Sequence, residues 1–326
     1  MIKKRVVFIY RSRMRNGHSI ENVFRTIERG LLQTNYEVVN YFLEKPLLIA
    51  VKELKALNAD YYHITGDIYF LAMLLPRDKT TLTLHDIGFY KNHKKTARLL
   101  LKGLLWLSFP LRYVKKFSVI SELVKNDVVQ YFGISTEKIF VIPNPLTLSL
   151  QKSEKPFDVN RVRILQIGTG PHKNLIGLIE AVKSKGHIHL DIIGNPNEEL
   201  INLMIDYKIS YAVYRNISNE EVIQLYSDVD IIYFASFSEG FGLPILEGQA
   251  AAKVVITSDM SPMKEVADGG AILVNPHNAA SIRLALENVI QNQELRNTTI
   301  TKGFDNLKKY DLDHIVSLYI QLFEKA

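Results

Sequence analysis

Residues 236–247 read Ser-Phe-Ser-Glu-Gly-Phe-Gly-Leu-Pro-Ile-Leu-Glu. A β-branched and aromatic run at residues 231–234 precedes this segment and predicts a buried strand. Pro244 stands where a helix would begin, and proline favours the first helical position because its missing N–H would have had no partner there. The segment therefore predicts a strand, a glycine-containing turn and a helix whose N-terminal N–H groups could receive phosphate or sugar oxygens.

Two carboxylates flank this turn, with Glu239 before the predicted helix and Glu247 about one turn into it. They could accept hydrogen bonds from different hydroxyls of one extended ligand. Gly240 and Gly242 would let the backbone approach that ligand closely. By spacing alone, an ordinary glycine turn followed by a helix is an equally good interpretation.

The same alternation of strand and helix patterns runs along the whole chain. Strands are expected at residues 5–10, 36–41, 61–64, 81–84, 116–120 and 139–142, and again at 162–167, 188–193, 211–214, 231–234, 254–256 and 271–274. Helices are expected between them, for example at 19–32, 51–57, 122–132, 174–183, 198–207, 219–226, 244–252, 279–291 and 312–324. Such alternation predicts parallel sheets covered by helices, here built twice.

A polar segment at residues 149–160 is the best candidate for a linker. We therefore expect a first domain over residues 1–148, a second over 149–305, and a C-terminal helix within 306–326 that crosses back to the first domain. The predicted fold class is α/β, with two Rossmann-like domains facing each other across a cleft.

Composition limits the function classes. The chain of 326 residues has no cysteine, which excludes disulfide and thiolate chemistry and suits a reducing cytoplasm. No apolar stretch reaches the roughly 18 residues that a membrane-spanning helix needs. The net charge of +6 combines a basic first half with an acidic second half, which suggests two domains with different partners.

The segment from Glu239 to Glu247 resembles the E-x7-E motif of glycosyltransferase family 4, a family of retaining enzymes with the GT-B architecture. The resemblance implies that the first glutamate and the backbone after it hold the donor sugar and its phosphates. It implies that the second glutamate binds the ribose. The residues so assigned are Glu239, Gly240, Phe241, Gly242, Leu243 and Glu247.

Residues 167–174, Ile-Gly-Thr-Gly-Pro-His-Lys-Asn, resemble the first strand, turn and helix of the family's donor domain. There a lysine in the place of Lys173 contacts the donor diphosphate, so Gly168, Thr169 and Lys173 are predicted to bind the donor. Many relatives carry an arginine where this chain has Thr169, so the identity of a second phosphate ligand is open. A solvated lysine at a helix start is the alternative interpretation.

In the first half, Thr83-Leu84-His85-Asp86 resembles the family's segment with a histidine near the reacting sugar. The resemblance implies that His85 positions the sugar and the transition state, although a histidine after a strand is more often structural. Gly17, in an Asn-Gly pair, is the remnant of a glycine-rich loop that faces the donor phosphates in relatives.

No metal or cofactor is expected. Asp228-Val229-Asp230 has the D-x-D form of a metal-binding motif, but it leads into a predicted buried strand, and the resembling fold works without a bound metal. The expected co-substrate is a nucleoside diphosphate sugar, with UDP preferred over GDP.

Residues 91–116, from Lys91 to Lys116, contain eight basic residues and no acidic one, interleaved with leucines and Trp106. This pattern is typical of a helix lying in an anionic membrane interface, where each cation contributes about 1 kcal/mol. In the alternative interpretation, the leucines pack into the first domain and the charges face water.

The predicted function is a metal-independent, retaining glycosyltransferase of the hexosyltransferase type. Its acceptor would be a saccharide or a lipid-linked sugar in cell-surface polysaccharide or glycoconjugate synthesis. The protein would lie in the cytoplasm, as a peripheral protein on the inner face of the plasma membrane. A nucleotide-sugar epimerase of the same fold and a catalytically silent binding module are the alternatives. No nucleic-acid partner is expected, because the basic stretch carries leucines rather than stacking aromatic residues.

Overall fold

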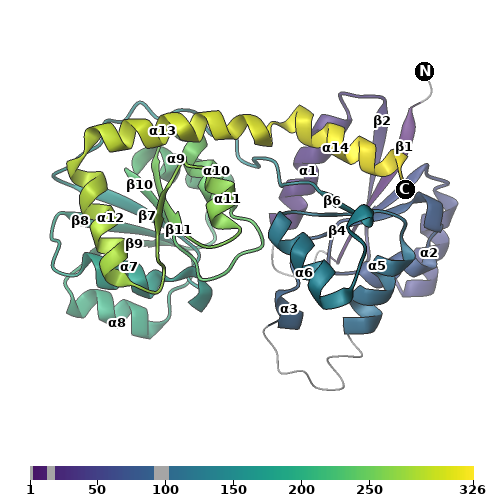
Figure 1. The fold of residues 1–326 in the computed structure, drawn as a ribbon, viewed down its shortest axis with the longest axis horizontal. Helices are drawn as coiled ribbons and strands as arrows, with labels where there is room; N and C mark the ends of the chain where they lie inside the picture. Colours follow the sequence, from purple (N-terminus) through teal and green to yellow (C-terminus); the bar gives the residue numbers. More distant parts are fainter. Residues whose placement is uncertain (1–2, 13–18, 92–102) are drawn as a thin grey trace. The chain divides into compact units, whose positions relative to one another are not determined.

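The computed structural model describes residues 3–12, 19–91 and 103–326. The chain divides into two compact units (Figure 1). One unit comprises Met1–Thr147 together with Tyr310–Ala326, and the other comprises Leu148–Lys309. Each unit is a six-stranded sheet with flanking helices, and every pair of neighbouring strands is parallel. The predicted class of two α/β, Rossmann-like domains is confirmed.

The sheet of the first unit has the strand order β2-β1-β3-β4-β5-β6. Its strands are β1 (Lys4–Tyr10), β2 (Tyr36–Phe42), β3 (Tyr61–Ile64), β4 (Thr80–Leu84), β5 (Phe117–Val119) and β6 (Ile139–Val141). β1 lies inside the sheet, and its residues from Val6 to Ile9 are fully buried. Apolar runs without alternation are expected for strands that are covered on both faces.

Helices and helical turns connect these strands. They are α1 (Ser19–Leu31), α2 (Leu47–Ala56), η1 (Tyr69–Leu74), η2 (Arg77–Lys79), α3 (Gly88–Lys91), the π-helical turn η3 (Leu104–Ser108), α5 (Phe109–Tyr113), α6 (Glu122–Phe132) and η4 (Thr136–Lys138). α6 shows why such a helix forms where it does. The Ser121 hydroxyl accepts a hydrogen bond from Val124 N at its start, and Gly133 ends it with φ +61°.

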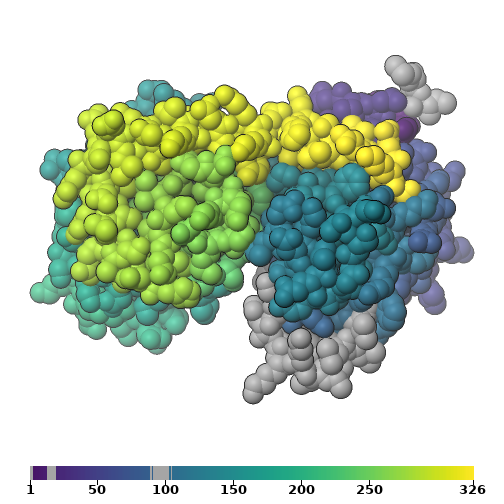
Figure 2. All heavy atoms as spheres, in the orientation of Figure 1, coloured from purple at the N-terminus to yellow at the C-terminus, as the bar shows by residue number. Residues whose placement is uncertain are grey.

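The C-terminal helix α14 (Leu312–Glu324) belongs to the first unit and packs on α1 (Figure 1). Figure 2 shows α14, in yellow, on the surface of this unit. Its buried Tyr319 hydroxyl lies 3.2 Å from Thr83 Oγ1 of β4. The ring of His63 on β3 lies within 2.9 Å of Thr81 Oγ1 and Thr83 Oγ1. Burial lowers the pKa of His63 to about 3, so the neutral ring joins this network of hydroxyls.

The sheet of the second unit has the order β12-β11-β10-β7-β8-β9. Its strands are β7 (Val162–Ile167), β8 (Ile188–Ile193), β9 (Ser210–Tyr214), β10 (Ile231–Phe234), β11 (Val254–Ser258) and β12 (Ile272–Val274). Its helices and helical turns are η5 (Pro171–Lys173), α7 (Leu175–Val182), α8 (Glu198–Asp206), α9 (Asn219–Asp228), α10 (Leu243–Ala250), α11 (Met263–Ala267), α12 (Ala279–Gln291) and α13 (Gln293–Leu307), followed by η6 (Lys308–Tyr310) where the chain returns to the first unit.

Several elements differ from the sequence-based expectation, among them α2, which spans Leu47–Ala56 where a helix was expected at 51–57. Helix α10 begins at Leu243, so Pro244 is its second residue rather than its first. The sequence also did not predict α13, which is polar and contains Gly303. This glycine is explained by packing, because a Cβ there would lie 2.9 Å from Cγ of Gln249 on α10.

Candidate active site

The candidate site lies at the carboxyl ends of β7 and β10, which are neighbours in the second sheet. From β7 the chain continues to β8 on one side, and β10 lies on the other side. The loops after β7 and β10 therefore diverge, and this point of an open parallel sheet is where ligands bind. The two sequence segments predicted to bind the donor are those two loops.

The loop after β7 is shaped by Gly168, which has φ +86°. A Cβ at Gly168 would lie 3.1 Å from Cε of Lys173, so only glycine lets the lysine chain cross the loop at this distance. Gln166 Nε2 donates to the carbonyl oxygens of Gly168 and Lys173 at 2.9 and 3.2 Å. Thr169 Oγ1 accepts a hydrogen bond from Asn195 N at 3.0 Å, which ties this loop to the loop after β8.

Lys173 and Glu239 form an ion pair between the two loops. Lys173 Nζ lies 2.7 Å from Glu239 Oε1, and the side chains are 21% and 14% exposed, so a ligand could still reach both. Lys173 Nζ also lies 4.7 Å from the centre of the Phe234 ring. The Lys173 ammonium and the Glu239 carboxylate thus lie in contact at the carboxyl ends of β7 and β10.

Helix α10 starts directly after this ion pair. Its N-cap residue is Gly242, with φ +129°, and no side chain caps the helix. A Cβ at Gly242 would lie 3.0 Å from Cδ1 of Ile245 and would be strained at this φ. Uncapped N–H groups at a helix N-terminus attract anions. Gly240, the buried Phe241 and Leu243 form the backbone that leads into this end.

Glu247 lies on α10 and is 8% exposed. Its Oε2 accepts a hydrogen bond of 2.5 Å from the hydroxyl of Tyr226 on α9. Burial, with the nearby Glu247 charge, raises the pKa of Tyr226, so the hydroxyl remains a donor. Sequence analysis missed Tyr226, and no motif marks this residue 21 positions before its partner.

His85 follows β4 in the first unit. Its Nε2 lies 2.7 Å from the carbonyl oxygen of Thr65. Because a carbonyl only accepts, Nε2 carries the hydrogen and Nδ1 is left as an acceptor. Burial lowers the pKa of His85 and keeps the ring neutral. Asp86 Oδ1 accepts from Gly88 N at 2.8 Å, a structural role that orients the loop.

Gly17 lies outside the described residues, as do residues 92–102 of the basic segment. In the described part of that segment, the side chains of Leu105, Trp106 and Phe109 are 44%, 40% and 48% exposed. Among residues 103–116, the three cations have partners within the fold: Arg112 binds the Phe132 carbonyl oxygen, Lys115 binds Asp78, and Lys116 binds the Glu137 carbonyl oxygen. No described helix is long and apolar enough to cross a membrane.

The two aspartates of the D-x-D sequence lie at the opposite, amino-terminal edge of the second sheet. Asp230 is 4% exposed and pairs with Lys155 at 2.8 Å, and Asp228 accepts a hydrogen bond from Gln224. Among the described residues, no three histidine or acidic side chains gather as a metal site would require.

Known proteins match both units. A family model described as glycosyl transferases group 1 matches residues 150–305, and one described as glycosyltransferase family 4 matches residues 5–150. The chain is 29% identical over 245 residues to the O-antigen chain mannosyltransferase RfbU of Salmonella typhimurium, covering 70% of this chain and 67% of RfbU.

A second curated relative is the N,N'-diacetylbacillosaminyl-diphospho-undecaprenol alpha-1,3-N-acetylgalactosaminyltransferase of Campylobacter jejuni. It is 22% identical over 258 residues, or 74% of this chain and 67% of its own. Among solved structures, HepE of Anabaena in complex with UDP and glucose superposes with a TM-score of 0.80 at 15% identity, over 99% of this chain and 100% of HepE.

Proposed function

Since this chain belongs to the glycosyltransferases of family 4, with the GT-B architecture, we propose that it transfers a sugar from a nucleoside diphosphate sugar to a hydroxyl group of a saccharide or lipid-linked acceptor. The proposed transfer retains the configuration at the anomeric carbon. The observation that carries the proposal is the ion pair of Lys173 and Glu239 beside the uncapped start of α10.

We assign the donor diphosphate to the positive side of this arrangement. Lys173 supplies a point charge, and the N–H groups at the start of α10, with the loop of Gly168 and Thr169, supply hydrogen bonds to phosphate oxygens. When the donor enters, Lys173 can exchange part of its contact with Glu239 for the phosphates. Glu239 is then free to accept hydrogen bonds from sugar hydroxyls, together with the backbone from Gly240 to Leu243.

Glu247 is assigned to the ribose hydroxyls. Its Oε2 is engaged by Tyr226, and this bond fixes the orientation of the carboxylate. A fixed acceptor loses little entropy when the ligand binds. His85 is assigned to the sugar, with Nδ1 as the atom that can accept a hydrogen bond from a hydroxyl. Gly17 keeps its predicted role near the phosphates.

In the proposed reaction, the acceptor oxygen attacks the anomeric carbon on the face from which the diphosphate leaves. The bond between the anomeric carbon and the phosphate oxygen breaks, and the acceptor proton passes to an oxygen of the leaving diphosphate. Lys173 and the helix N–H groups stabilise the charge that develops there, without proton transfer by the protein. No metal is assigned a part in this step.

The relatives suggest the class of substrates. Two of them are named as a mannosyltransferase of O-antigen chains and an enzyme acting on a diphospho-undecaprenol sugar. We therefore propose a hexose donor and an acceptor from cell-surface polysaccharide synthesis. UDP is the proposed nucleotide, and it is the ligand named with the structural neighbour HepE.

We also propose a cytoplasmic protein that contacts the inner face of the plasma membrane. The exposed Leu105, Trp106 and Phe109 form an apolar group within the basic segment of residues 91–116. Apolar side chains among cations are the combination that binds an anionic interface. A lipid-linked acceptor would be presented at such a surface.

Incubation of the full chain with radiolabelled UDP-glucose, UDP-N-acetylglucosamine, UDP-galactose and GDP-mannose tests the proposal. The acceptors would be a lipid-linked disaccharide and a soluble oligosaccharide. We expect acceptor-dependent release of the nucleoside diphosphate from one donor, with a UDP-sugar giving the faster rate. Conversion of the donor sugar without any acceptor would instead identify an epimerase, and failure to bind any donor would refute the proposal.

A further inference from the structure

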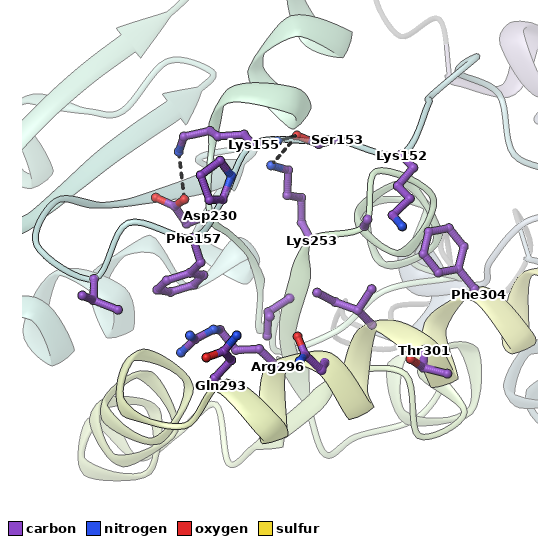
Figure 3. A pocket seen from close by; sticks show the side chains of 16 residues that line it. Lys152, Ser153, Lys155, Phe157, Asp230, Lys253, Gln293, Arg296, Thr301 and Phe304 are labelled. Atoms are coloured by element: carbon purple, nitrogen blue, oxygen red, sulfur yellow. Dashed lines mark hydrogen bonds and ion pairs between the residues drawn. The ribbon is translucent and has the colours of Figure 1, made fainter.

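A hollow of about 710 Å³ lies at the amino-terminal edge of the second sheet, at the opposite end of the strands from Lys173 and Glu239. Figure 3 shows its two sides. Lys152, Ser153 and Lys155, which precede β7, form one side, and α13 forms the other, with Lys253 between them. This volume suits a small organic molecule rather than a single ion.

The polar lining of the hollow is strongly cationic. Lys152, Lys155, Lys253 and Arg296 line it, whereas Asp230 is the only carboxylate among its described lining residues. In the part of the chain that the structure describes, no carboxylate lies within ion-pair distance of Lys152, Lys253 or Arg296. The described lining of the hollow therefore carries four cations against one carboxylate.

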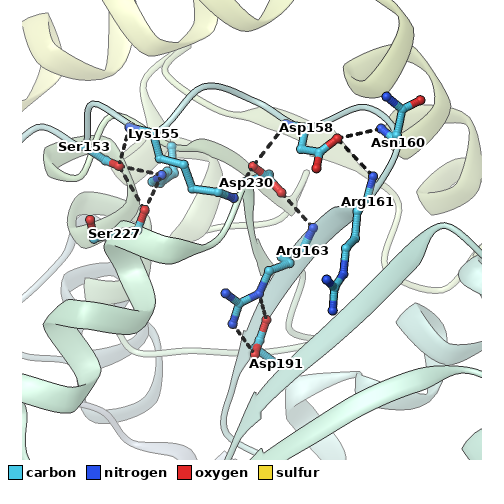
Figure 4. Close-up of polar contacts among 10 residues, drawn as sticks. Ser153, Lys155, Asp158, Asn160, Arg161, Arg163, Asp191, Ser227 and Asp230 are labelled. Atoms are coloured by element: carbon cyan, nitrogen blue, oxygen red, sulfur yellow. Dashed lines mark hydrogen bonds and ion pairs between the residues drawn. The ribbon is translucent and has the colours of Figure 1, made fainter.

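Both carboxylate oxygens of Asp230 have partners within the protein (Figure 4). Its Oδ1 lies 2.8 Å from Lys155 Nζ, and its Oδ2 accepts a hydrogen bond of 2.8 Å from the backbone N of Arg163. Asp230 is 4% exposed, so its carboxylate is shielded from water, whereas the Lys155 side chain is 34% exposed. Its carboxylate pairs with Lys155, while Lys152, Lys253 and Arg296 have no carboxylate within ion-pair distance among the described residues.

Lys253 is 5% exposed. Its ammonium donates to Ser153 Oγ at 2.9 Å and to the Ser227 carbonyl oxygen at 2.7 Å. An ammonium has three N–H donors, so one remains. Burial and the neighbouring Lys155 lower the pKa of Lys253 to about 8. The carboxylates of Asp230 and Asp228 act in the opposite direction, and an anion in the hollow would add to their stabilisation of the buried ammonium.

Arg296 adds a planar donor group. Its Nη1 donates to the carbonyl oxygens of Val289 and Ile290 at 2.7 and 2.9 Å, and its guanidinium lies 4.3 Å from the ring centre of Phe157. These contacts fix the guanidinium and leave its Nε and Nη2 donors without a protein partner among the described residues. A fixed guanidinium fork matches the oxygens of a phosphate.

Apolar side chains complete the wall, among them Phe157, Ile300 and Phe304. From this combination we infer that the hollow is a second binding site, distinct from the donor site, for an organic phosphate. Its phosphate group binds at the cationic lining of the hollow, and its carbon skeleton packs on the apolar wall. The site does not depend on the proposed transferase activity.

A purely structural role accounts for only part of these observations. Lys253 joins the last turn of α9, through the Ser227 carbonyl oxygen, to Ser153 in the segment before β7. That role explains its burial. It does not explain why Lys152 and two donor nitrogens of Arg296, none of which has a hydrogen-bond or ion-pair partner among the described residues, line the same hollow.

Isothermal titration of the full chain with hexyl phosphate, glucose 1-phosphate and inorganic phosphate tests the inference. Lys152→Glu should weaken the binding of hexyl phosphate about tenfold or more, since it removes one charged contact and adds a repulsive one. Lys302→Glu is the matched control, because Lys302 lies exposed on α13 outside the hollow and the change in net charge is the same. It should leave binding unchanged.

Phe304→Ala should weaken the binding of hexyl phosphate and leave the binding of inorganic phosphate unchanged. Tighter binding of hexyl phosphate than of glucose 1-phosphate would identify the ligand class of the hollow as an alkyl phosphate. Tighter binding of glucose 1-phosphate would identify it as a sugar phosphate. Equal effects of Lys152→Glu and Lys302→Glu, or no binding of any of the three compounds, would overturn the inference. So would binding that UDP abolishes and Lys152→Glu leaves intact, because the phosphate would then occupy the site of Lys173.

Discussion

At the scale of single residues, the candidate site depends on the ion pair between Lys173 and Glu239. Their 2.7 Å contact joins two loops that are 66 residues apart in sequence. A partly exposed ion pair contributes little to stability, so its position at the carboxyl edge is better explained by ligand binding. In our proposal, the donor diphosphate takes over part of the contact that Glu239 makes with Lys173.

Lys173→Ala should lower kcat about 100-fold, because one preorganised charge facing the leaving diphosphate would be lost. Lys183→Ala is the matched control. Lys183 directly follows α7, the helix that Lys173 precedes. Its ammonium pairs with Glu180 on the surface, so its removal should leave kcat unchanged. Steady-state kinetics with the preferred donor measures both variants. Unchanged kcat and donor affinity in Lys173→Ala would show that the lysine does not contact the phosphates.

The sequence motif named Lys173, Glu239 and Glu247 as candidate donor ligands but could not reveal their partners within the fold. Glu239 and Glu247 were singled out because their segment resembles the E-x7-E motif, whereas their spacing alone fits an ordinary glycine turn equally well. The hydrogen bond between Tyr226 and Glu247 was not predictable, because it depends on how α9 packs against α10. The contact of Nε2 of His85 with the Thr65 carbonyl oxygen likewise arises from neighbouring strands.

At the scale of elements, Asn174 determines how the loop after β7 joins α7. It is the N-cap of α7, with φ +57°, and its Oδ1 accepts a hydrogen bond from Gly177 N. Its Nδ2 also donates to the carbonyl oxygens of Ala235 and Pro276, at 3.1 and 2.8 Å. One buried amide thus fixes the chain after β7, after β10 and after β12.

Asn174→Gly should lower the free energy of unfolding by about 2 kcal/mol, because two buried carbonyl groups would lose their donor while the positive φ stays unstrained. The control is Asn197→Gly, at the exposed N-cap of α8, which should cost only a few tenths of a kcal/mol. Chemical denaturation of both variants measures the difference. Equal losses would mean that the contacts of Asn174 to Ala235 and Pro276 contribute nothing.

Element prediction succeeded where apolar periodicity was strong. The expected helices at residues 122–132, 279–291 and 312–324 match α6, α12 and α14 to the residue. It failed for α13, which is polar and is held by packing between Gly303 and Gln249 and by Asn306, whose Nδ2 donates to Gln249 Oε1 at 3.0 Å. Such contacts are set by tertiary structure rather than by periodicity.

At the scale of the whole molecule, repeated alternation of strands and helices was enough to predict two parallel sheets. The return of the chain to the first unit is anchored by Tyr319, which reaches the hydroxyl network of Thr83 and the neutral His63. The phosphate-binding hollow was not foreseen. Its cations come from the segment before β7, from the start of β11 and from α13, and only the folded unit brings them together.

The crystal structure of the chain with bound UDP tests the central claim most directly. Our account predicts the diphosphate within hydrogen-bonding distance of Lys173 Nζ and of the N–H groups at the start of α10, with the ribose hydroxyls on the carboxylate of Glu247. Density for the nucleotide elsewhere in the second unit, or Glu247 without contact to the ribose, would contradict it.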